Sequence, residues 1–308
     1  MTNSMRIIRQ SAFNTEHSLL RGNLHLHTSR SDGQLSPDEA VRKYAENGYD
    51  FVALTDHSVY NRESYAPETG MVIIPGVEVH TLLEEAGAGE RVYHSVFLGE
   101  DNESNGFLHD ERILIDNVKS QEEFQKYLDL AYSKNNIAFY SHPEWSQTPP
   151  RYFDKMKGLA GIEIWNTASS YRDYDINAPY WDDLLGQGMR LAGIAVDDAH
   201  KEHQYLGGWI MVNAEKNVPS ILSAIKNGAF YSSCGPVIKN FYFDGKHAVA
   251  ETEEECEKIF ICSDKHKHKV GENSSFFETE IADDCQYIRA VVKDKHGKRA
   301  WTNPIYLK

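Results

Sequence analysis

Residues 22–33 read GNLHLHTSRSDG, a short run in which His25 and His27 alternate with leucines and Asp32 follows in a polar segment. Alternate residues of a β-strand point to the same face, so the two histidines can bind one metal ion, with Asp32 following in the loop. Two histidines at this spacing also occur by chance on the surface or in the core of proteins. The stretch therefore indicates a metal site only if other parts of the chain supply further ligands.

Outward from this stretch, short apolar runs alternate with amphipathic segments up to about residue 230. Apolar runs bounded by polar turns predict strands, and apolar positions at helical spacing predict helices. The alternation is typical of βα units around a parallel sheet or barrel. The predicted strands cover residues 24–27, 51–55, 72–79, 92–98, 137–141, 162–165, 191–196 and 209–212.

Two of the predicted helices have clear boundaries. Ser36 and Glu39, with a proline between them, match an N-cap followed by a capping-box glutamate, and Gly48 lies where this helix should end. Ser120 and Glu123 predict a second capping box. The apolar residues that follow Glu123 recur at helical spacing and would cover one face of the sheet.

The pattern changes after residue 235, where strand and turn signals replace the helical spacing. Residues 237–243, 258–263, 286–292 and 301–306 are predicted strands, and 294–297 is a predicted hairpin turn. The acidic run at 251–257 and the histidine and lysine run at 265–269 are interpreted as solvated loops. The tail therefore predicts a small all-β domain.

Side chains that bind metal ions recur where the predicted strands end. These residues are Asp56, His57, Glu78, His94, His142, Asp198 and His200. In a barrel of parallel strands the carboxyl ends converge on one face. Histidines and carboxylates are the ligands of mixed metal sites, so the sequence predicts that these side chains assemble there.

Five motifs, HLHT with SDG, LTDH, PGVE, SHP and DDAH, follow one another over residues 22–200 and resemble the motifs of the PHP (polymerase and histidinol phosphatase) superfamily. The later GGW segment and the β tail resemble the stand-alone branch that includes carbaryl-hydrolase-like metallohydrolases. The resemblance implies an α/β fold, a distorted (β/α)7 TIM-like barrel with a small C-terminal all-β domain. The expected division is an N-terminal extension at 1–21, the barrel at 22–235 and a β-sandwich-like domain at 236–308.

The resemblance also implies two or three divalent ions, zinc, manganese or iron, held by residues at the matching positions. The first ion would be held by His25, His27, Glu78 and Asp198. The second, bridged by Glu78, would be held by His94 and His142, and the third by Asp32, His57 and His200. Every ligand position is filled, which favours a working enzyme.

The leading hypothesis for function is a metal-dependent phosphoesterase that hydrolyses a small phosphorylated metabolite or nucleotide through a metal-bridging hydroxide. Two divalent ions about 3.5 to 4 Å apart lower the pKa of a bound water molecule and stabilise charge on the attacking and leaving oxygens. This chemistry does not depend on phosphorus, so a hydrolase of a carbamate, ester or amide bond is an alternative. A non-catalytic metal-binding module is another.

Six further residues are candidates for catalysis or substrate binding. His203 follows the last ligand and can donate a proton to the leaving group. Asp56, beside His57, can orient a ligand or a backbone group. A phosphate group needs cations close to the metal ions, and the candidates are Arg30, Arg151, Arg172 and Lys201.

The formal net charge of −14 disfavours nucleic acid and anionic membranes as partners, because it would repel phosphate groups over most of the surface. The N-terminal residues lack the apolar stretch of a signal peptide, and no run of about 18 apolar residues occurs. We therefore expect a cytoplasmic protein with four free cysteines that acts on a small phosphorylated molecule. The sequence leaves the oligomeric state open.

Overall fold

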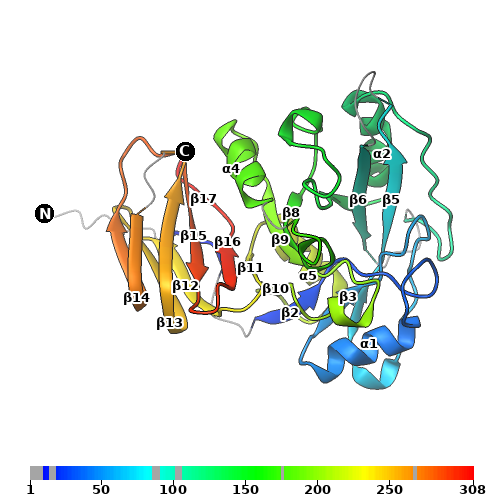
Figure 1. The fold of residues 1–308 in the computed structure, drawn as a ribbon, viewed down its shortest axis with the longest axis horizontal. Coiled ribbons are helices and arrows are strands. Elements are labelled where there is room, and N and C mark those ends of the chain that lie inside the picture. The colour runs from blue at the N-terminus through cyan, green and yellow to red at the C-terminus, as the bar shows by residue number, and fades with distance from the viewer. Residues whose placement is uncertain (1–9, 14–18, 85–90, 101–105, 175–176, 266–268) are drawn as a thin grey trace, which may run out of the picture.

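The computed structural model describes residues 10–13, 19–84, 91–100, 106–174, 177–265 and 269–308. Within these residues the strands form two sheets (Figure 1). The larger sheet contains, in order across it, β1 (Gln10–Ser11), β12 (Ile238–Phe243), β13 (His247–Ser263), β15 (Tyr287–Lys293), β16 (Arg299–Thr302), β11 (Phe230–Ser233), β10 (Trp209–Val212), β2 (Leu20–Asn23), β3 (Phe51–Ala53) and β4 (Val72–Ile74). Two further strands pair beside this path, β14 (Lys269–Glu280) with β13 and β17 (Ile305–Tyr306) with β15.

The smaller sheet has five strands, and Glu78 and His94 lie on two of them. Its order is β5 (Gly76–Leu82), β6 (Val92–Gly99), β7 (Asn136–Tyr140), β8 (Gly161–Asn166) and β9 (Ala192–Val196). The helices of the described part of the chain are α1 (Pro37–Glu46), α2 (Gln121–Ser133), α3 (Thr167–Ser170), α4 (Ala178–Gly186) and α5 (Val218–Lys226). Short 3-10 turns lie at η1 (Pro67–Thr69), η2 (Pro150–Tyr152) and η3 (Glu202–Gln204).

The two sheets approach each other through isolated backbone bridges. Leu26, which follows β2, pairs in parallel with Ala199 after β9, and His57, which follows β3, pairs in parallel with Glu78 of β5. These bridges gather the ends of strands from both sheets at one place. They do not join the sheets into a continuous ladder, so the mixed α/β fold is clear and the predicted seven-stranded barrel is not confirmed.

The expectation of purely parallel βα units is wrong for part of the smaller sheet. β7, β8 and β9 are parallel neighbours, but β6 pairs antiparallel with both β5 and β7. The connection from β5 to β6 carries no helix among its described residues, which suffices for an antiparallel neighbour, whereas the connection from β6 to β7 contains α2 although these strands are also antiparallel. The apolar runs of β5 and β6 look alike in either case, which is why the sequence pattern did not separate them.

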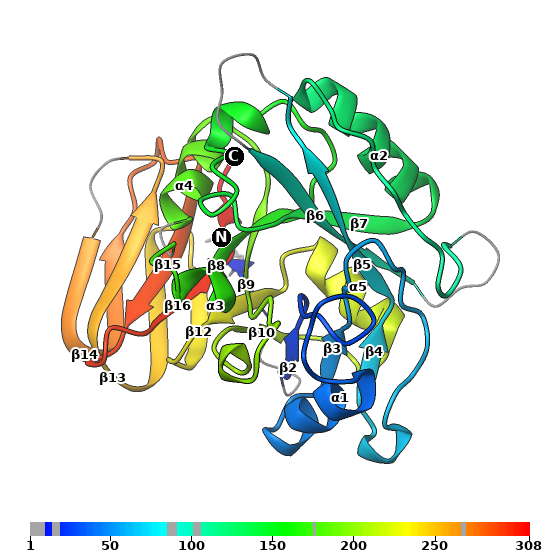
Figure 2. The ribbon, with the colours of Figure 1, turned by 45° about the vertical axis from the view of Figure 1, so that its right-hand side comes forward.

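Both predicted helix starts are confirmed. Ser36 caps α1 in a full capping box with Glu39, and Gly48 follows the helix at a φ of 76°, where a side chain would be strained. Ser120 caps α2 by accepting from the Glu123 backbone N–H, while the Glu123 carboxylate accepts from the Lys119 backbone N–H. Figure 2 shows α2 lying against the smaller sheet beside β7, and its buried Phe124 and Leu128 belong to that core.

Several strand predictions are corrected. The first strand ends at Asn23, and residues 24–27 form only the bridge at Leu26. The predicted strand at 72–79 is interrupted by Pro75, which separates β4 from β5 and places them in different sheets. A proline has no backbone N–H to donate to a ladder, so the interruption there is physically reasonable.

The C-terminal strands form one end of the molecule (Figure 1). The acidic run 251–257, expected to be a loop, lies inside β13, where Thr252 and Cys256 are buried while Glu253 to Glu255 are exposed. The predicted hairpin at 294–297 joins β15 to β16, which pair antiparallel. All four cysteines are free and buried, as expected. The domain limits at 21 and 235 stay predictions, because the larger sheet runs through both sides of each limit.

None of the helices in the described ranges is long and apolar enough to cross a membrane.

Candidate metal centre

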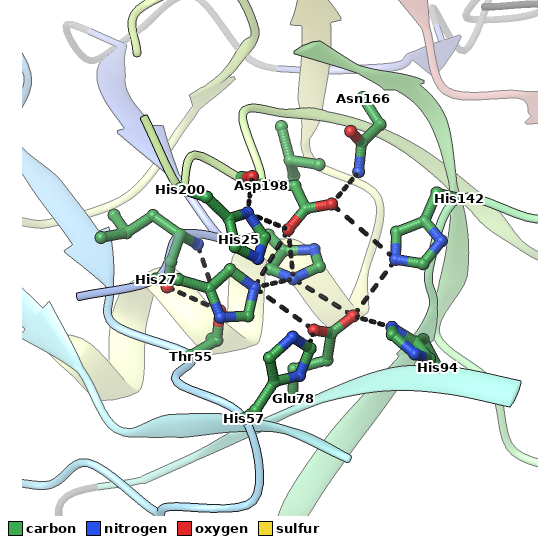
Figure 3. A network of polar contacts seen from close by, with 12 residues as sticks. His25, His27, Thr55, His57, Glu78, His94, His142, Asn166, Asp198 and His200 are labelled. Atoms are coloured by element: carbon green, nitrogen blue, oxygen red, sulfur yellow. Dashed lines mark hydrogen bonds and ion pairs between the residues drawn. The ribbon is translucent and has the colours of Figure 1, made fainter. Parts of the chain in front are cut away.

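The structure brings the predicted metal ligands together at the ends of the strands (Figure 3). Their nitrogen and oxygen atoms form three overlapping groups within 4.8 Å, which are His25, His27, Glu78 and Asp198; His57, Glu78 and His94; and His27, Asp32, His57 and His200. His142 joins them through Glu78, since its Nε2 lies 3.2 Å from Glu78 Oε1. All nine residues named by the sequence analysis therefore lie in one cluster.

Glu78 lies at the centre of the cluster. Its side chain is 1% exposed, and its two oxygens face five imidazole rings at 2.9 to 3.3 Å, those of His25, His27, His57, His94 and His142. Glu78 and His94 come from the paired strands β5 and β6, and the other four histidines come from segments that follow β2, β3 and β7. One carboxylate shared by so many imidazoles is suited to bridging two metal ions.

Asp198 and Asp32 provide the remaining carboxylates. Asp198 follows β9, and its Oδ1 lies 3.3 Å from His25 Nε2 and 3.0 Å from His27 Nε2. Asp32 Oδ2 lies 3.4 Å from His200 Nε2 and 3.8 Å from His57 Nε2. The Asp32 side chain is about half exposed, so its group borders the solvent while the group around Asp198 is enclosed.

The buried histidines and carboxylates of the cluster shift one another's pKa values. Burial alone would lower the pKa of His25, but the carboxylates of Asp198 and Glu78 outweigh it and raise that pKa well above its usual value. The same opposition of burial and carboxylates raises the pKa of His27 to about 9. Burial alone would raise the pKa values of Glu78 and Asp198, yet the neighbouring histidines hold both well below the usual range. These buried carboxylates therefore need positive charge close by, and metal ions supply it while displacing protons.

Three buried atoms of the cluster lack a well-formed hydrogen bond within the described residues: His57 Nδ1, Glu78 Oε2 and Asp198 Oδ1. His57 Nδ1 and Glu78 Oε2 lie only 3.1 Å apart, so the atoms face each other without the alignment of a hydrogen bond. Buried polar atoms in native proteins almost always have partners. Imidazole nitrogens and carboxylate oxygens bind zinc, manganese and iron, so this donor set fits divalent metal ions.

A comparison with known families identifies the chain. The sequence profile of the PHP domain matches residues 23–177, half of the protein, and the match includes seven of the nine clustered residues. This chain belongs to the PHP family. Membership accounts for the order of the motifs along the chain and supports a metal-dependent hydrolase, because the assembled side chains are those of a metal site.

Two known proteins are similar to this PHP protein. A 5′-3′ exoribonuclease from Haemophilus influenzae is 40% identical over 68 residues, which are 21% of this chain and 25% of that protein. The chain therefore matches about a quarter of the length of that relative. A crystal structure from Bacteroides vulgatus, titled a two-domain protein containing a predicted PHP-like metal-dependent phosphoesterase, has a TM-score of 0.51 at 13% identity. The match between the two structures covers 96% of this chain and 98% of the Bacteroides chain, so the two proteins share a fold.

A cavity of about 540 Å³ gives access to the PHP metal centre. The cluster forms one side of it, and Trp145, Tyr171, Arg172, Lys201 and His203 line the rest. Three of the sequence-predicted residues, Arg172, Lys201 and His203, are thus placed at the site. The rim of the cavity carries cations and aromatic rings, and the cluster of histidines and carboxylates lies beside them.

The other two predicted substrate cations are not at the site. Arg30 pairs with Asp110 and donates to Asn61, and it does not line the cavity. Arg151 lines a separate cavity of about 190 Å³ beside the start of α2. Their placement corrects the prediction for both, because nearness in sequence to a ligand motif does not fix the direction of a long side chain.

Asp56 and Asp197 are buried carboxylates beside the ligands that face away from the cluster. Asp56 accepts from the Thr28 backbone and hydroxyl and from Ser31, each at 2.8 Å, so it holds the loop between His27 and Asp32. The predicted role of Asp56, to orient a ligand or a backbone group, fits these contacts. Asp197 accepts from Tyr44 and Thr167 and from the backbone of 206–208.

The sequence analysis missed Glu163, Asn166 and Trp145, which contact ligands of the centre. Glu163 of β8 contacts His25 at 2.6 Å, Asn166 of β8 donates to Asp198 at 3.1 Å, and Trp145 packs against the His142 ring at 4.9 Å. A single glutamate within the otherwise apolar segment 161–165 was a usable signal for Glu163, because a fully buried carboxylate must have partners. Trp145 carried no such signal.

Proposed function

We propose that this PHP protein is a metal-dependent phosphoesterase that hydrolyses a small phosphorylated metabolite or nucleotide. The observation that carries the proposal is the Glu78 carboxylate, buried among five imidazoles beside a cavity with cations on its rim. Phosphate esters are anionic, so they need positive charge at the reacting group and around it. In this proposal the metal centre supplies positive charge at the reacting group, and the cations on the rim supply it around that group.

In this proposal the cluster holds two or three ions of zinc, manganese or iron. Glu78 would contribute to two ions, one that His25, His27 and Asp198 would hold and one that His94 and His142 would hold, and Asp32, His57 and His200 would hold a third. Bound there, the cations lower the pKa of a water molecule and stabilise the charge that develops on phosphorus oxygens. The chain's own contribution is to hold these donors in place and to orient the substrate.

The rim residues have distinct proposed tasks. Arg172 and Lys201 bind substrate oxygens, because both line the cavity and neither makes an ion pair with a residue that the structure describes. His203, also on the rim, donates a proton to the leaving oxygen. The Tyr171 hydroxyl donates to the His203 backbone carbonyl at 2.8 Å, and their rings meet edge to face, which orients this histidine.

The proposed setting is the mouth of a distorted seven-stranded barrel made by β2, β3 and β5 to β9. The bridges from Leu26 to Ala199 and from His57 to Glu78 support it, since they connect the two gaps left between the sheets. Residues 236–308 are proposed as a separate β-sandwich-like domain, supported by a buried core around Phe241, Ile259 and Ile288 to which these residues contribute most of the side chains, together with Phe13 and Tyr231.

The test combines metal analysis with a choice of substrates. Purified protein is analysed for metals and assayed with p-nitrophenyl phosphate, bis-p-nitrophenyl phosphate, p-nitrophenyl acetate and a 5′-phosphorylated oligoribonucleotide, with added Mn²⁺ or Zn²⁺. We expect two or three metals per chain and release of p-nitrophenol from a phosphate ester. Glu78→Ala should abolish both, whereas Glu272→Ala, an exposed glutamate on β14, should change neither.

The other outcomes decide between the alternatives. Cleavage of the acetate alone would replace the phosphoesterase with a hydrolase of carbon esters or amides on the same metals. Cleavage of the oligoribonucleotide alone would point to the activity named for the Haemophilus relative. A wild-type protein that stays metal-free and inactive after addition of either ion would refute the proposal.

A further inference from the structure

Strand β8 supplies no proposed metal ligand, yet two of its side chains contact three of the ligands. Glu163 and Asn166 are both fully buried at the end of β8. Glu163 Oε1 lies 2.6 Å from His25 Nδ1, and Glu163 Oε2 accepts from the His142 backbone N–H at 2.9 Å. Asn166 Nδ2 donates to Glu163 Oε2 at 2.9 Å and to Asp198 Oδ2 at 3.1 Å, the latter visible in Figure 3.

A bulge explains how both side chains reach the same place. Residues three apart in a regular strand point to opposite faces, so Glu163 and Asn166 should diverge. The pairing of β8 with β9 shifts register between Glu163 and Trp165, which inserts one extra residue into β8. Such a bulge redirects the side chains that follow it. Glu163 and Asn166 therefore both point toward the metal centre.

The contact with Glu163 fixes which nitrogen of His25 is free to bind metal. A carboxylate only accepts hydrogen bonds, so the proton of the imidazole lies on Nδ1. The lone pair is then on Nε2, which lies 3.3 Å from both Glu78 Oε1 and Asp198 Oδ1. A histidine held in this way by a carboxylate is oriented toward the metal and is a stronger ligand.

The same side chains stabilise unusual backbone at two other ligands. His142 has a φ of 25° and Asp198 a φ of 51°, in the left-handed region that residues other than glycine seldom adopt. Such conformations persist when surrounding contacts hold them. Glu163 binds the His142 N–H directly, and Asn166 binds the Asp198 carboxylate, so each strained ligand has a partner on β8.

We propose that Glu163, braced by Asn166, is a positioning residue that sets the Nε2 of His25 and the backbone of His142 for metal binding. The inference rests on the proposed metal site. It explains a buried acid that the three ligand groups do not use, and it assigns to β8 the task of aligning ligands from three separate segments.

The experiment replaces Glu163 by glutamine, which keeps size and removes the charge. The amide cannot accept from both His25 Nδ1 and the His142 N–H, because one of its two ends is a donor. Zn²⁺ titrated into metal-free protein should bind about 10- to 100-fold more weakly to Glu163→Gln than to wild type. The visible spectrum of the Co²⁺-substituted variant should also change in shape, which loss of stability alone would not cause.

The matched control is Asp197→Asn, the same change at an equally buried carboxylate whose hydrogen bonds go to non-ligand groups. It should bind Zn²⁺ as wild type does. Equal affinity and an unchanged Co²⁺ spectrum in Glu163→Gln would overturn the inference while leaving the metal site intact. Absence of Zn²⁺ binding by wild type would instead refute the proposed function and the inference with it.

A measurement on wild type decides the matter if Glu163→Gln does not fold. ¹⁵N NMR of histidine-labelled, zinc-loaded protein distinguishes a ring bound through Nε2 from one bound through Nδ1. We expect His25 to bind through Nε2 and to keep a proton on Nδ1. Zinc bound to His25 through Nδ1 would overturn the inference, since that nitrogen could not then donate to Glu163.

Discussion

Asp197 and Asp198 are adjacent, equal in chemistry and buried, yet their surroundings are opposite. Asp197 accepts five hydrogen bonds, from Tyr44, Thr167 and three consecutive backbone N–H groups. Asp198 faces histidine rings, and its Oδ1 has no well-formed hydrogen bond among the described residues. The chain satisfies the first carboxylate with its own donors and leaves the second for another partner.

The pKa values follow the same division. Burial raises the pKa of Asp197 to about 6, and its hydrogen bonds only partly oppose that rise. For Asp198 the positive charge of His25 and the close approach of His27 Nε2 outweigh burial and hold the pKa far below its usual value. Satisfied buried acids thus support the fold, while acids surrounded by imidazoles mark a cation site.

The largest expected loss of metal and turnover follows a change of Glu78, the carboxylate at the centre of the histidine cluster. Glu78→Gln keeps the shape of the side chain and removes the charge shared by the histidines, so the ions should be lost. Turnover should fall by more than the roughly 100-fold that loss of an outer contact causes. Elemental analysis and a kinetic assay check this, with circular dichroism to show that the fold persists. Wild-type metal content in this variant would contradict the comparison.

The next effect is the stabilisation that a cation provides. Because only the folded chain brings these histidines and carboxylates within 4.8 Å of one another, Zn²⁺ should bind the folded state and not the unfolded one. At 100 times its Kd, the ion raises the free energy of unfolding by about 2.7 kcal/mol. Thermal unfolding with and without Zn²⁺ measures it, and Glu78→Gln should show a much smaller shift. An equal shift in the variant would place the zinc elsewhere.

A smaller effect, on stability alone, is expected at Asp197, whose carboxylate accepts hydrogen bonds from the protein itself. Asp197→Asn places an amide group against backbone N–H donors of 206–208, which cannot reverse their role. We expect a loss of about 1 to 3 kcal/mol in unfolding free energy, with wild-type metal content. Urea unfolding of the metal-free proteins measures the loss. A variant that keeps its stability but loses its metal would reverse the roles assigned to the two aspartates.

The ligand set was predictable because it depends on residue type and order, not on exact geometry. His25 and His27 lie on one face even though the strand ends at Asn23, since the extended backbone there still alternates. Glu78, His94 and Asp198 fall where strands carry them to a common end whichever way β6 runs. The motif order alone therefore located the site.

Other features depended on local events that the sequence pattern does not record. Asn166 points to the same side as Glu163 because of a bulge between them, which adds a residue without a distinct residue type. The antiparallel course of β6 and the division of 72–79 between two sheets depend on which neighbours the strands find. Strand propensity is set largely by such surroundings, so the acidic segment 251–257 was mistaken for a loop.

The same contrast between a side chain with protein partners and one without them among the described residues distinguishes two arginines, and it predicts the smallest effect, on KM. Arg30 is held by Asp110 and Asn61, whereas Arg172 lies on the cavity rim and forms no ion pair with the described residues. Arg172→Ala should raise KM for a phosphate ester about 10-fold with little change in kcat, because a hydrogen bond to a charged group contributes about 1.5 kcal/mol. Steady-state kinetics measures both constants.

The control for Arg172 is Arg151→Ala, which removes the same charge from the separate cavity beside α2. Both variants lower the net charge equally, so a general loss of attraction for anions would raise both KM values alike. A contact at the rim would raise only that of Arg172→Ala. If Arg151→Ala has the larger effect, the substrate enters from the side of α2, and Arg172 on the rim does not mark the binding surface.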